Sequence, residues 1–444
     1  MNHVLKVVCV LYVLAVTAAC LHGQQAPVAA PAAQSKRASD YLNDDLPRWV
    51  RFNGEYRVRL EGIGGNNFRP SSDAYVLSRV RINTTFIPLS WLRAGFQGQD
   101  AQVMARNAKP DGPPFEDTFD LRQAYVELGN VESNKLGLRA GRQEMVFGEQ
   151  RLVGHVSWLN TARAFDAVRA TYRNKHVRVD AFAASVVNVR EAEFNKRTDG
   201  NNFHGVYTVL NTLVPKGTVE PYVFWRLARG VRSEAGGLQK LNFQTYGVRS
   251  AGKLPARFDY NMDVAGQAGS LGPEDVQAWA GHWLLGYTVA AKYTPRVIAE
   301  YNYATGDPDP ADGHREAFDQ LYPTPHDKYG LADQVGWKNI HHIRSGVELK
   351  PSAKLALSGG YHSWWLASTR DGLYNAGGAL LARVADGSAG RHVGQEGDMQ
   401  AVYTVNAQIQ LSGGYARIFP GTFLQRATPG HSHNFSYVMI NYMF

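Results

Sequence analysis

Polar and apolar residues alternate one by one along most of this sequence from Arg51 onward. In the segment RFNGEYRVRL, which begins at Arg51, every second position from that arginine is arginine, asparagine or glutamate. The segments YVLSRVRINTTF, from Tyr75, and RFDYNMDV, from Arg257, show a similar alternation. Successive side chains of a β-strand point to opposite faces, so this period of two predicts strands with one polar and one apolar face.

The number and length of these segments favour a membrane barrel over a soluble sandwich, whose strands would also alternate. We count roughly eighteen segments, most near the ~10 residues with which a tilted strand crosses a bilayer. Aromatic residues such as Trp49, Trp91 and Trp225 lie near segment ends. With 19% charged residues, no stretch beyond the N-terminus offers the ~18 apolar residues of a membrane helix. We predict an all-β fold, a transmembrane antiparallel β-barrel of the outer-membrane type with about 18 strands.

The last segment, FSYVMINYMF at residues 435–444, indicates how the barrel closes. One of its faces carries Val438, Ile440, Tyr442 and Phe444. We expect this face to meet lipid while the strand pairs with the first one, because closure leaves no free edge. A terminal phenylalanine with an aromatic residue two positions earlier also resembles the signal read by the outer-membrane barrel assembly machinery. Tyr442 and Phe444 are therefore candidate assembly residues.

The N-terminus has the composition of a segment for export. Residues 1–23 combine a short basic start with an apolar run, which predicts a secretory signal peptide. Residues 24–47 are rich in alanine, proline and polar residues and are expected to form a flexible periplasmic segment. The barrel then occupies 48–444. Both cysteines, Cys9 and Cys20, lie in or beside the signal, so disulfides do not hold the fold, and lipid attachment at Cys20 stays open.

Connections are expected to alternate between short periplasmic turns and long extracellular loops. The sequence predicts short turns at 87–90, 173–175 and 350–353. It predicts long loops at 102–118, 145–164, 229–241, 305–338 and 367–395. Loops of this length imply caps or functional segments.

Arginine dominates the polar faces of the early segments. The net charge is +8, and 33 of the 47 basic residues are arginine. Seven positions are candidate pore-lining cations: Arg57, Arg59, Arg79, Arg81, Arg93, Arg139 and Arg169. A one-sided bank of arginines in a water-filled pore selects for anions. In an alternative reading the arginines pair with acids across the lumen, as mixed-charge pairs such as Arg178 with Asp180 and Arg296 with Glu300 in later segments allow.

Motifs for catalysis or metal binding are weak. Neither HExxH nor GxSxG occurs. The acidic stretch GDPDPADG, with Asp307, Asp309 and Asp312, lacks the spacing of an EF-hand loop and is better explained as a polar turn, although calcium binding stays open. The neighbours His341 and His342 point to opposite faces of one strand. We expect no enzyme activity, no cofactor, no metal site and no nucleic-acid partner.

Three blocks resemble the bacterial alginate export family, outer-membrane barrels of eighteen strands. They are LRQAYVELG at 121–129, LRAGRQEMVFGEQRLVGHVSWLNTARAFDAVR at 138–169 and FDQLYPTPHDKYGLADQVGWKN at 318–339. The resemblance implies a channel, and in the best-known member an arginine-lined constriction that passes a polyuronate. Carried over from the motifs, the candidate pore or loop residues are Arg122, Arg142, Arg151 and Arg163, with Asp166 as a partner carboxylate.

The leading hypothesis is an anion-selective outer-membrane porin that exports or admits an acidic polysaccharide such as alginate or a related polyuronate. Its expected partners are outer-membrane lipid and lipopolysaccharide, the barrel assembly machinery, the anionic saccharide and periplasmic export proteins. A second hypothesis is an outer-membrane enzyme that uses His155, Asp166 and His326. A third is a structural barrel with a closed lumen, which extensive pairing of arginines with acids would favour.

Overall fold

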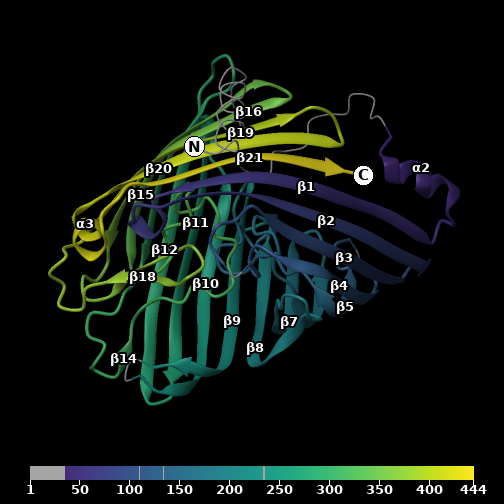
Figure 1. The fold of residues 1–444 in the computed structure, drawn as a ribbon. Helices are drawn as coiled ribbons and strands as arrows, with labels where there is room; N and C mark the ends of the chain where they lie inside the picture. The colour runs from purple at the N-terminus through teal and green to yellow at the C-terminus, as the bar shows by residue number, and fades with distance from the viewer. Residues whose placement is uncertain (1–35, 110, 134, 234–235) are drawn as a thin grey trace.

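The computed structural model describes residues 36–109, 111–133, 135–233 and 236–444. The expected signal peptide at 1–23 and the first part of the expected flexible segment lie outside the described residues. The described chain forms a barrel wall with several connections folded against it (Figure 1).

Eighteen strands of the described chain form one closed antiparallel barrel, which confirms the predicted fold. Each pairs with its neighbour in the sequence, and β1 pairs with β21 to close the ring. The wall strands are β1 (Val50–Gly64), β2 (Ser72–Leu89), β3 (Leu92–Met104), β4 (Asp117–Leu128), β5 (Leu136–Gln143), β6 (Phe165–Arg173), β7 (Val177–Asn188), β8 (Lys196–Leu210), β9 (Gly217–Arg232), β10 (Leu238–Lys253), β11 (Phe258–Leu271), β12 (Glu274–Thr288), β13 (Arg296–Ala304), β15 (Ile340–Ser352), β16 (Leu355–Leu366), β19 (His392–Thr404), β20 (Ile409–Pro420) and β21 (His433–Met443).

Shorter elements lie in the connections and at the N-terminus. They are the helices α2 (Ala38–Asp45) and α3 (Thr422–Ala427), the 3-10 turns η1 (Asn66–Phe68) and η2 (Pro255–Arg257), and the short strands β14 (His314–Arg315), β17 (Gly372–Tyr374) and β18 (Leu380–Arg383). Strands β17 and β18 pair only with each other among the described strands. No described helix has the length and apolar character needed to cross a membrane.

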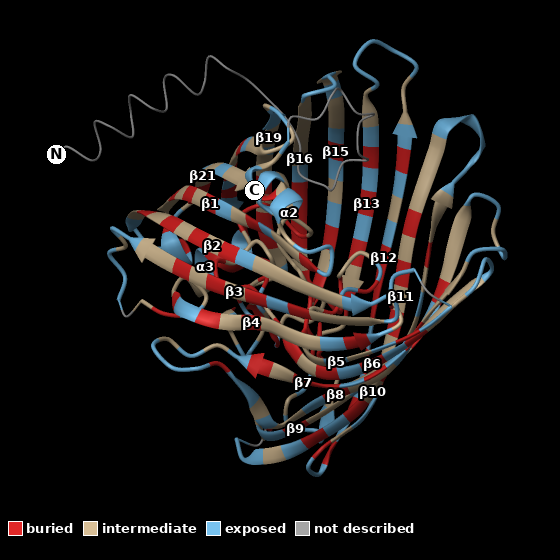
Figure 2. Ribbon diagram, turned by 90° about the vertical axis from the view of Figure 1, so that its right-hand side faces the viewer, coloured by how far each residue is buried: buried red, intermediate tan, exposed pale blue. Residues whose placement is uncertain are grey.

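Polar side chains on the inner face and apolar side chains on the outer face characterise much of the wall, although buried aromatic residues line the inner face of β6 to β10. Arg57 and Arg59 of β1 are buried, whereas Tyr56, which precedes Arg57 in the same strand, is exposed. Buried and exposed residues alternate along the wall strands in Figure 2. Exposed apolar side chains, such as Ile82 and Leu285, recur around the barrel. An apolar outer band of this kind is typical of barrels whose outer solvent is lipid.

The orientation predicted for the last strand is confirmed. Val438 and Ile440 are exposed, while Phe435 and Tyr437 on the opposite face are buried. Phe444 extends the pairing beyond β21, because its backbone N–H and carbonyl both bond to Gly54. Gly54 has no side chain, and a Cβ there would collide with the Phe444 ring at 2.5 Å.

Most predicted connections are present, and one is wrong. The turns between β2 and β3, β6 and β7, and β15 and β16 fall at the expected short sites. Long connections occur at 105–116, 144–164, 305–339 and 367–391. The predicted loop at 229–241 is instead a tight hairpin, because β9 continues to Arg232 and β10 begins at Leu238. Backbone pairing between β9 and β10 continues to Arg232 and Leu238, so the two ends of the predicted loop are strand.

Residues 24–47 were expected to be flexible, but their described part, from residue 36, contains the helix α2. The side chain of Asn43 donates to the carbonyl of Phe52 at 2.7 Å, and the Phe52 N–H donates to the Asn43 carbonyl oxygen at 2.8 Å. These two bonds dock α2 beside the C-terminal end of the barrel (Figure 2). The composition of this stretch did not indicate the helix, because its anchor is a contact with β1 rather than an apolar stripe.

Candidate functional site

The connection between β5 and β6 folds into the barrel and fills part of the lumen. We call residues 144–164 the lumen loop. Most of its apolar side chains are buried, and Phe147 stacks on the wall residues Phe182 and Tyr207, with ring centroids 5.4 and 4.9 Å apart. Val153 also forms a bridge with Tyr322 of the 305–339 connection. The two connections therefore support each other inside the lumen.

The lumen loop lies against a set of buried arginines on β1, β2 and β4. This arginine cluster consists of Arg57, Arg59, Arg79, Arg81 and Arg122. Each of these residues is at most 6% exposed, so its guanidinium donors need partners inside the protein. The period-two pattern predicted the inward direction of the first four, and the structure places Arg122 beside them.

Backbone carbonyls of the lumen loop occupy several of these donors. Arg57 and Arg79 each donate to the Ser157 carbonyl at 2.8 Å. Arg59 donates to the Trp158 carbonyl at 2.7 Å. Arg79 also donates to the carbonyl of Leu159 at 3.1 Å. A carbonyl oxygen is a neutral acceptor, so it satisfies the hydrogen bond without neutralising the charge.

Carboxylates pair with part of the arginine cluster. Glu61 lies 2.6 Å from Arg59, Glu55 lies 2.6 Å from Arg79, and Glu144 accepts from Arg122. Four of the five guanidiniums, those of Arg59, Arg79, Arg81 and Arg122, thus contact three carboxylates. The alternative of pairing across the lumen therefore describes part of the site, but positive charge remains in excess within these contacts.

Trp158 at the tip of the lumen loop is held on two sides. The Arg59 guanidinium lies over its ring at 3.7 Å, and the His326 ring stacks in parallel at a centroid distance of 3.7 Å. Tyr437 of β21 meets the ring edge-on at 4.9 Å. His326 in turn lies 2.7 Å from Asp333. Sequence reasoning missed this clamp, since its members come from distant parts of the chain.

The titratable groups of the lumen loop depend on these arginines. Burial opposes ionisation of Glu144, but the charge and the hydrogen bond of Arg122 outweigh it and hold the pKa of Glu144 below its usual value. Burial and the nearby arginines lower the pKa of His155, against the attraction of Glu144. Burial also lowers the pKa of Arg163 to about 10. The docked loop therefore carries a carboxylate and disfavours a charged His155.

The structure distributes the other predicted cations around the wall. Arg139 lies 2.5 Å from Glu127, and the more exposed Arg93 lies 3.9 Å from the same carboxylate. Arg169 pairs with Asp180 at 2.8 Å. These arginines line the barrel interior but lie in separate ion pairs from the arginine cluster.

The residues carried over from the family motifs separate into three places. Arg142 pairs with Asp166 at 2.9 Å. Arg163 donates to the carbonyls of Gly154 and Pro323, so it ties the lumen loop to the 305–339 connection. Arg151 reaches the other side of the lumen, where it contacts Glu300 at 3.0 Å.

A small cavity of ≈ 20 Å³ lies beside the arginine cluster, between the wall and the lumen loop. Arg122 and Arg142 line it together with Asp117 and Asp120. The residues of the enzyme hypothesis do not meet there: His155 bonds to Gln150, while Asp166 and His326 have the partners given above. The chemistry that this region can perform is the binding of oxyanions by guanidinium donors.

The chain is similar to proteins of the alginate export family over residues 48–438. It also resembles solved porins in fold. OccK8 (OprE) of Pseudomonas aeruginosa is 11% identical with a TM-score of 0.59, over 88% of this chain and 98% of that one. OpdO of the same species is 11% identical with a TM-score of 0.59, over 90% and 99% of the two chains.

OccAB3 of Acinetobacter baumannii is 10% identical with a TM-score of 0.60, over 88% of this chain and 99% of that one. At sequence identities this low, the similarity to these porins shows a shared fold alone. No curated protein matches the chain in sequence.

Proposed function

This chain belongs to the alginate export family of the bacterial outer membrane, and from that premise we propose that it is an anion-selective channel for an acidic polysaccharide such as alginate or a related polyuronate. The observation that carries the proposal is the arginine cluster facing the lumen loop. Its guanidinium donors meet neutral backbone carbonyls at the positions where a carboxylated saccharide would bind.

Exchange of partners gives the proposal a mechanism. When the lumen loop withdraws, Arg57, Arg59 and Arg79 lose the carbonyls of residues 157–159 and must find other acceptors. Carboxylates spaced along a polyuronate supply them in charge-assisted, bidentate form, which is stronger than the neutral contact they replace. Successive sugars can then pass the arginines without any covalent step.

The proposed channel would have lipid, assembly and periplasmic partners. The apolar outer face meets membrane lipid and lipopolysaccharide, and Tyr442 with Phe444 supplies the assembly signal. Export of a polymer would also require periplasmic proteins that deliver it to the short-turn side of the barrel.

The test is ion selectivity in planar lipid bilayers. We expect reversal potentials in a potassium chloride gradient to indicate preference for chloride, and addition of a polyuronate to block the chloride current. The double change Arg57→Gln and Arg79→Gln should weaken both effects, whereas Arg370→Gln, an exposed residue of the 367–391 connection, should leave both unchanged.

Cation preference in the unaltered protein would contradict the proposal. A barrel that never conducts, even after the lumen loop is shortened, would instead support a structural barrel with a closed lumen.

A further inference from the structure

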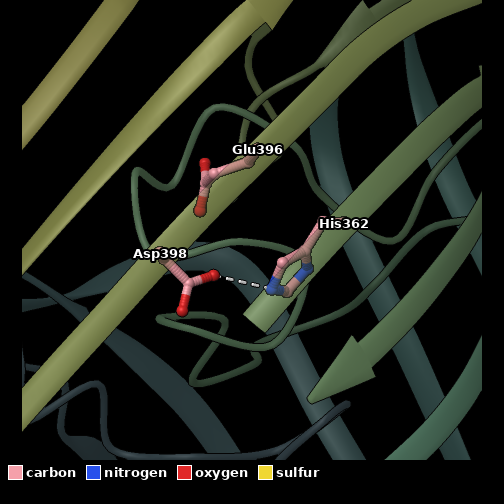
Figure 3. Close-up of side chains that lie close together, drawn as sticks. All are labelled: His362, Glu396 and Asp398. Atoms are coloured by element: carbon pink, nitrogen blue, oxygen red, sulfur yellow. Dashed lines mark ion pairs between the residues drawn. The ribbon is translucent and has the colours of Figure 1, made fainter. Parts of the chain in front are cut away.

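A buried cluster of metal-ligand side chains lies on the neighbouring wall strands β16 and β19. Glu396 and Asp398 stand two residues apart on β19, so both point inward. His362 of β16 pairs directly with Glu396 in the register of the two strands. One ligand atom from each of the three lies within 4.8 Å of the others. Figure 3 shows the three side chains close together, with the Asp398 carboxylate turned to the His362 ring and the Glu396 carboxylate beside them.

We propose that His362, Glu396 and Asp398 bind a divalent transition-metal cation, with Zn²⁺ as the representative ion. Imidazole nitrogen with carboxylate oxygen is a donor set that such cations accept. Three protein ligands leave a further coordination position for water. This site is separate from the arginine cluster.

Two carboxylate oxygens at this point lack hydrogen-bond partners. The Oε2 atom of Glu396 has none among the described residues, although this side chain is only 1% exposed. The Oδ2 atom of Asp398 forms an ion-pair contact with His362 Nε2 at 2.8 Å but has no hydrogen-bond partner among the described residues. Buried polar atoms are rarely left without a partner, because desolvation is then uncompensated. A cation between these atoms and the imidazole would satisfy both oxygens.

The surroundings hold the three ligands in place. His342 lies 2.9 Å from His362 Nδ1, which orients the ring so that Nε2 faces the carboxylates. The other oxygen of Glu396, Oε1, accepts from the Leu331 N–H at 2.5 Å. The outer contacts of metal ligands characteristically take this form: each ligand uses one atom for the metal and another for a neighbour.

Two glycines leave room for the acidic groups. A Cβ on Gly360 would lie 2.9 Å from His362 Nε2 and 3.0 Å from Asp398 Oδ2. A Cβ on Gly330, whose φ is +128°, would lie 2.9 and 3.0 Å from the Glu396 oxygens. Side chains at either position would therefore crowd the ligands.

Binding would require a modest movement. Ligand atoms around tetrahedral zinc lie about 3.3 Å apart, given metal–ligand distances of ~2.0 to 2.2 Å. The His362–Asp398 contact is already within that separation, so rotation of the Glu396 carboxylate completes the triad. Because Leu331 donates to Glu396, the cation would also fasten the 305–339 connection to the wall.

The test uses purified full-length protein in detergent, stripped with a chelator and then supplied with Zn²⁺ alone. After dialysis, we expect mass spectrometry to find about one zinc per chain. His362→Ala and the isosteric Glu396→Gln should weaken zinc affinity by at least about 100-fold. His176→Ala, which removes an exposed histidine from a turn, should retain the zinc.

Folding of each variant is checked by heat-dependent migration in electrophoresis and by circular dichroism. Cobalt(II) provides a second readout, because d–d absorption reports nitrogen and oxygen ligands directly. The proposal is overturned if folded wild-type protein retains no more zinc than Glu396→Gln, which would mean that a proton rather than a cation occupies the cluster. Loss of zinc in His176→Ala, or retention of Ca²⁺ but not Zn²⁺, would overturn it equally.

Discussion

Replacing Trp158 by alanine should release the tip of the lumen loop without unfolding the barrel. The indole ring contacts the Arg59 guanidinium at 3.7 Å, His326 at 3.7 Å and Tyr437 at 4.9 Å. Trp158→Ala removes these ring contacts. The backbone carbonyl that accepts from Arg59 remains, so the arginine cluster keeps part of its loop contacts.

The magnitude follows from the contacts removed. A desolvated cation–π contact contributes about 2 kcal/mol, and an edge-on aromatic pair about 0.5 to 1.5 kcal/mol. Loss of both contacts makes loop docking less favourable by roughly 2.5 to 3.5 kcal/mol. Since 1.4 kcal/mol corresponds to a tenfold change, the undocked population should rise by a factor of about 60 to 300. The wall strands keep all their pairing, so the midpoint of global urea unfolding should move little.

The assay is single-channel recording in planar bilayers at neutral pH. Trp158→Ala should open far more often than the wild type, whereas Trp91→Ala, which removes an exposed indole from the turn between β2 and β3, should not. Identical opening frequency and conductance in Trp158→Ala and wild type would show that the docked loop is not the barrier to conduction.

Three further outcomes are expected. Ile440→Lys should lower the free energy of unfolding in lipid by about 2 kcal/mol, because it places a charge on the lipid face. Met443→Lys should be tolerated, since position 443 pairs with Glu55 and faces the barrel interior. Equal losses of stability in the two variants would refute the assigned faces. Docking lowers the pKa of His155 below its usual value of 6.5. Docking is therefore strongest above pH 6.5 and weakens as the pH falls below it, because protonation of His155 then favours the undocked loop. Channel openings should become more frequent at pH 5.5, and this increase should be smaller in His155→Ala. Deleting Phe444 should reduce membrane insertion but not export to the periplasm, and unchanged insertion would remove its role as assembly signal.

The barrel itself could be predicted because its determinants are local and repeated. Alternation along a single strand already states which side chains share a face, and strand length is set by the membrane rather than by a partner. The direction of Arg57 and Arg79, and of Val438 and Ile440, follows from that period alone. The short turns were predictable for the same reason, since each depends on a few adjacent residues.

Positions within the lumen depend instead on contacts between distant segments. The lumen loop has no period that indicates where it folds, and its place against Arg59 is set by packing with the wall and with His326. The hairpin between β9 and β10 was misjudged because strand extension depends on pairing with a neighbour.

The cluster of His362, Glu396 and Asp398 shows the same division. Alternation places Glu396 and Asp398 on one face of their strand, but it does not say which residue of the next strand lies opposite. Strand register is fixed by the whole closed sheet, because a shift of one residue turns every side chain to the other face. Only the closed barrel brings His362 to these two carboxylates, and only docked connections bury them.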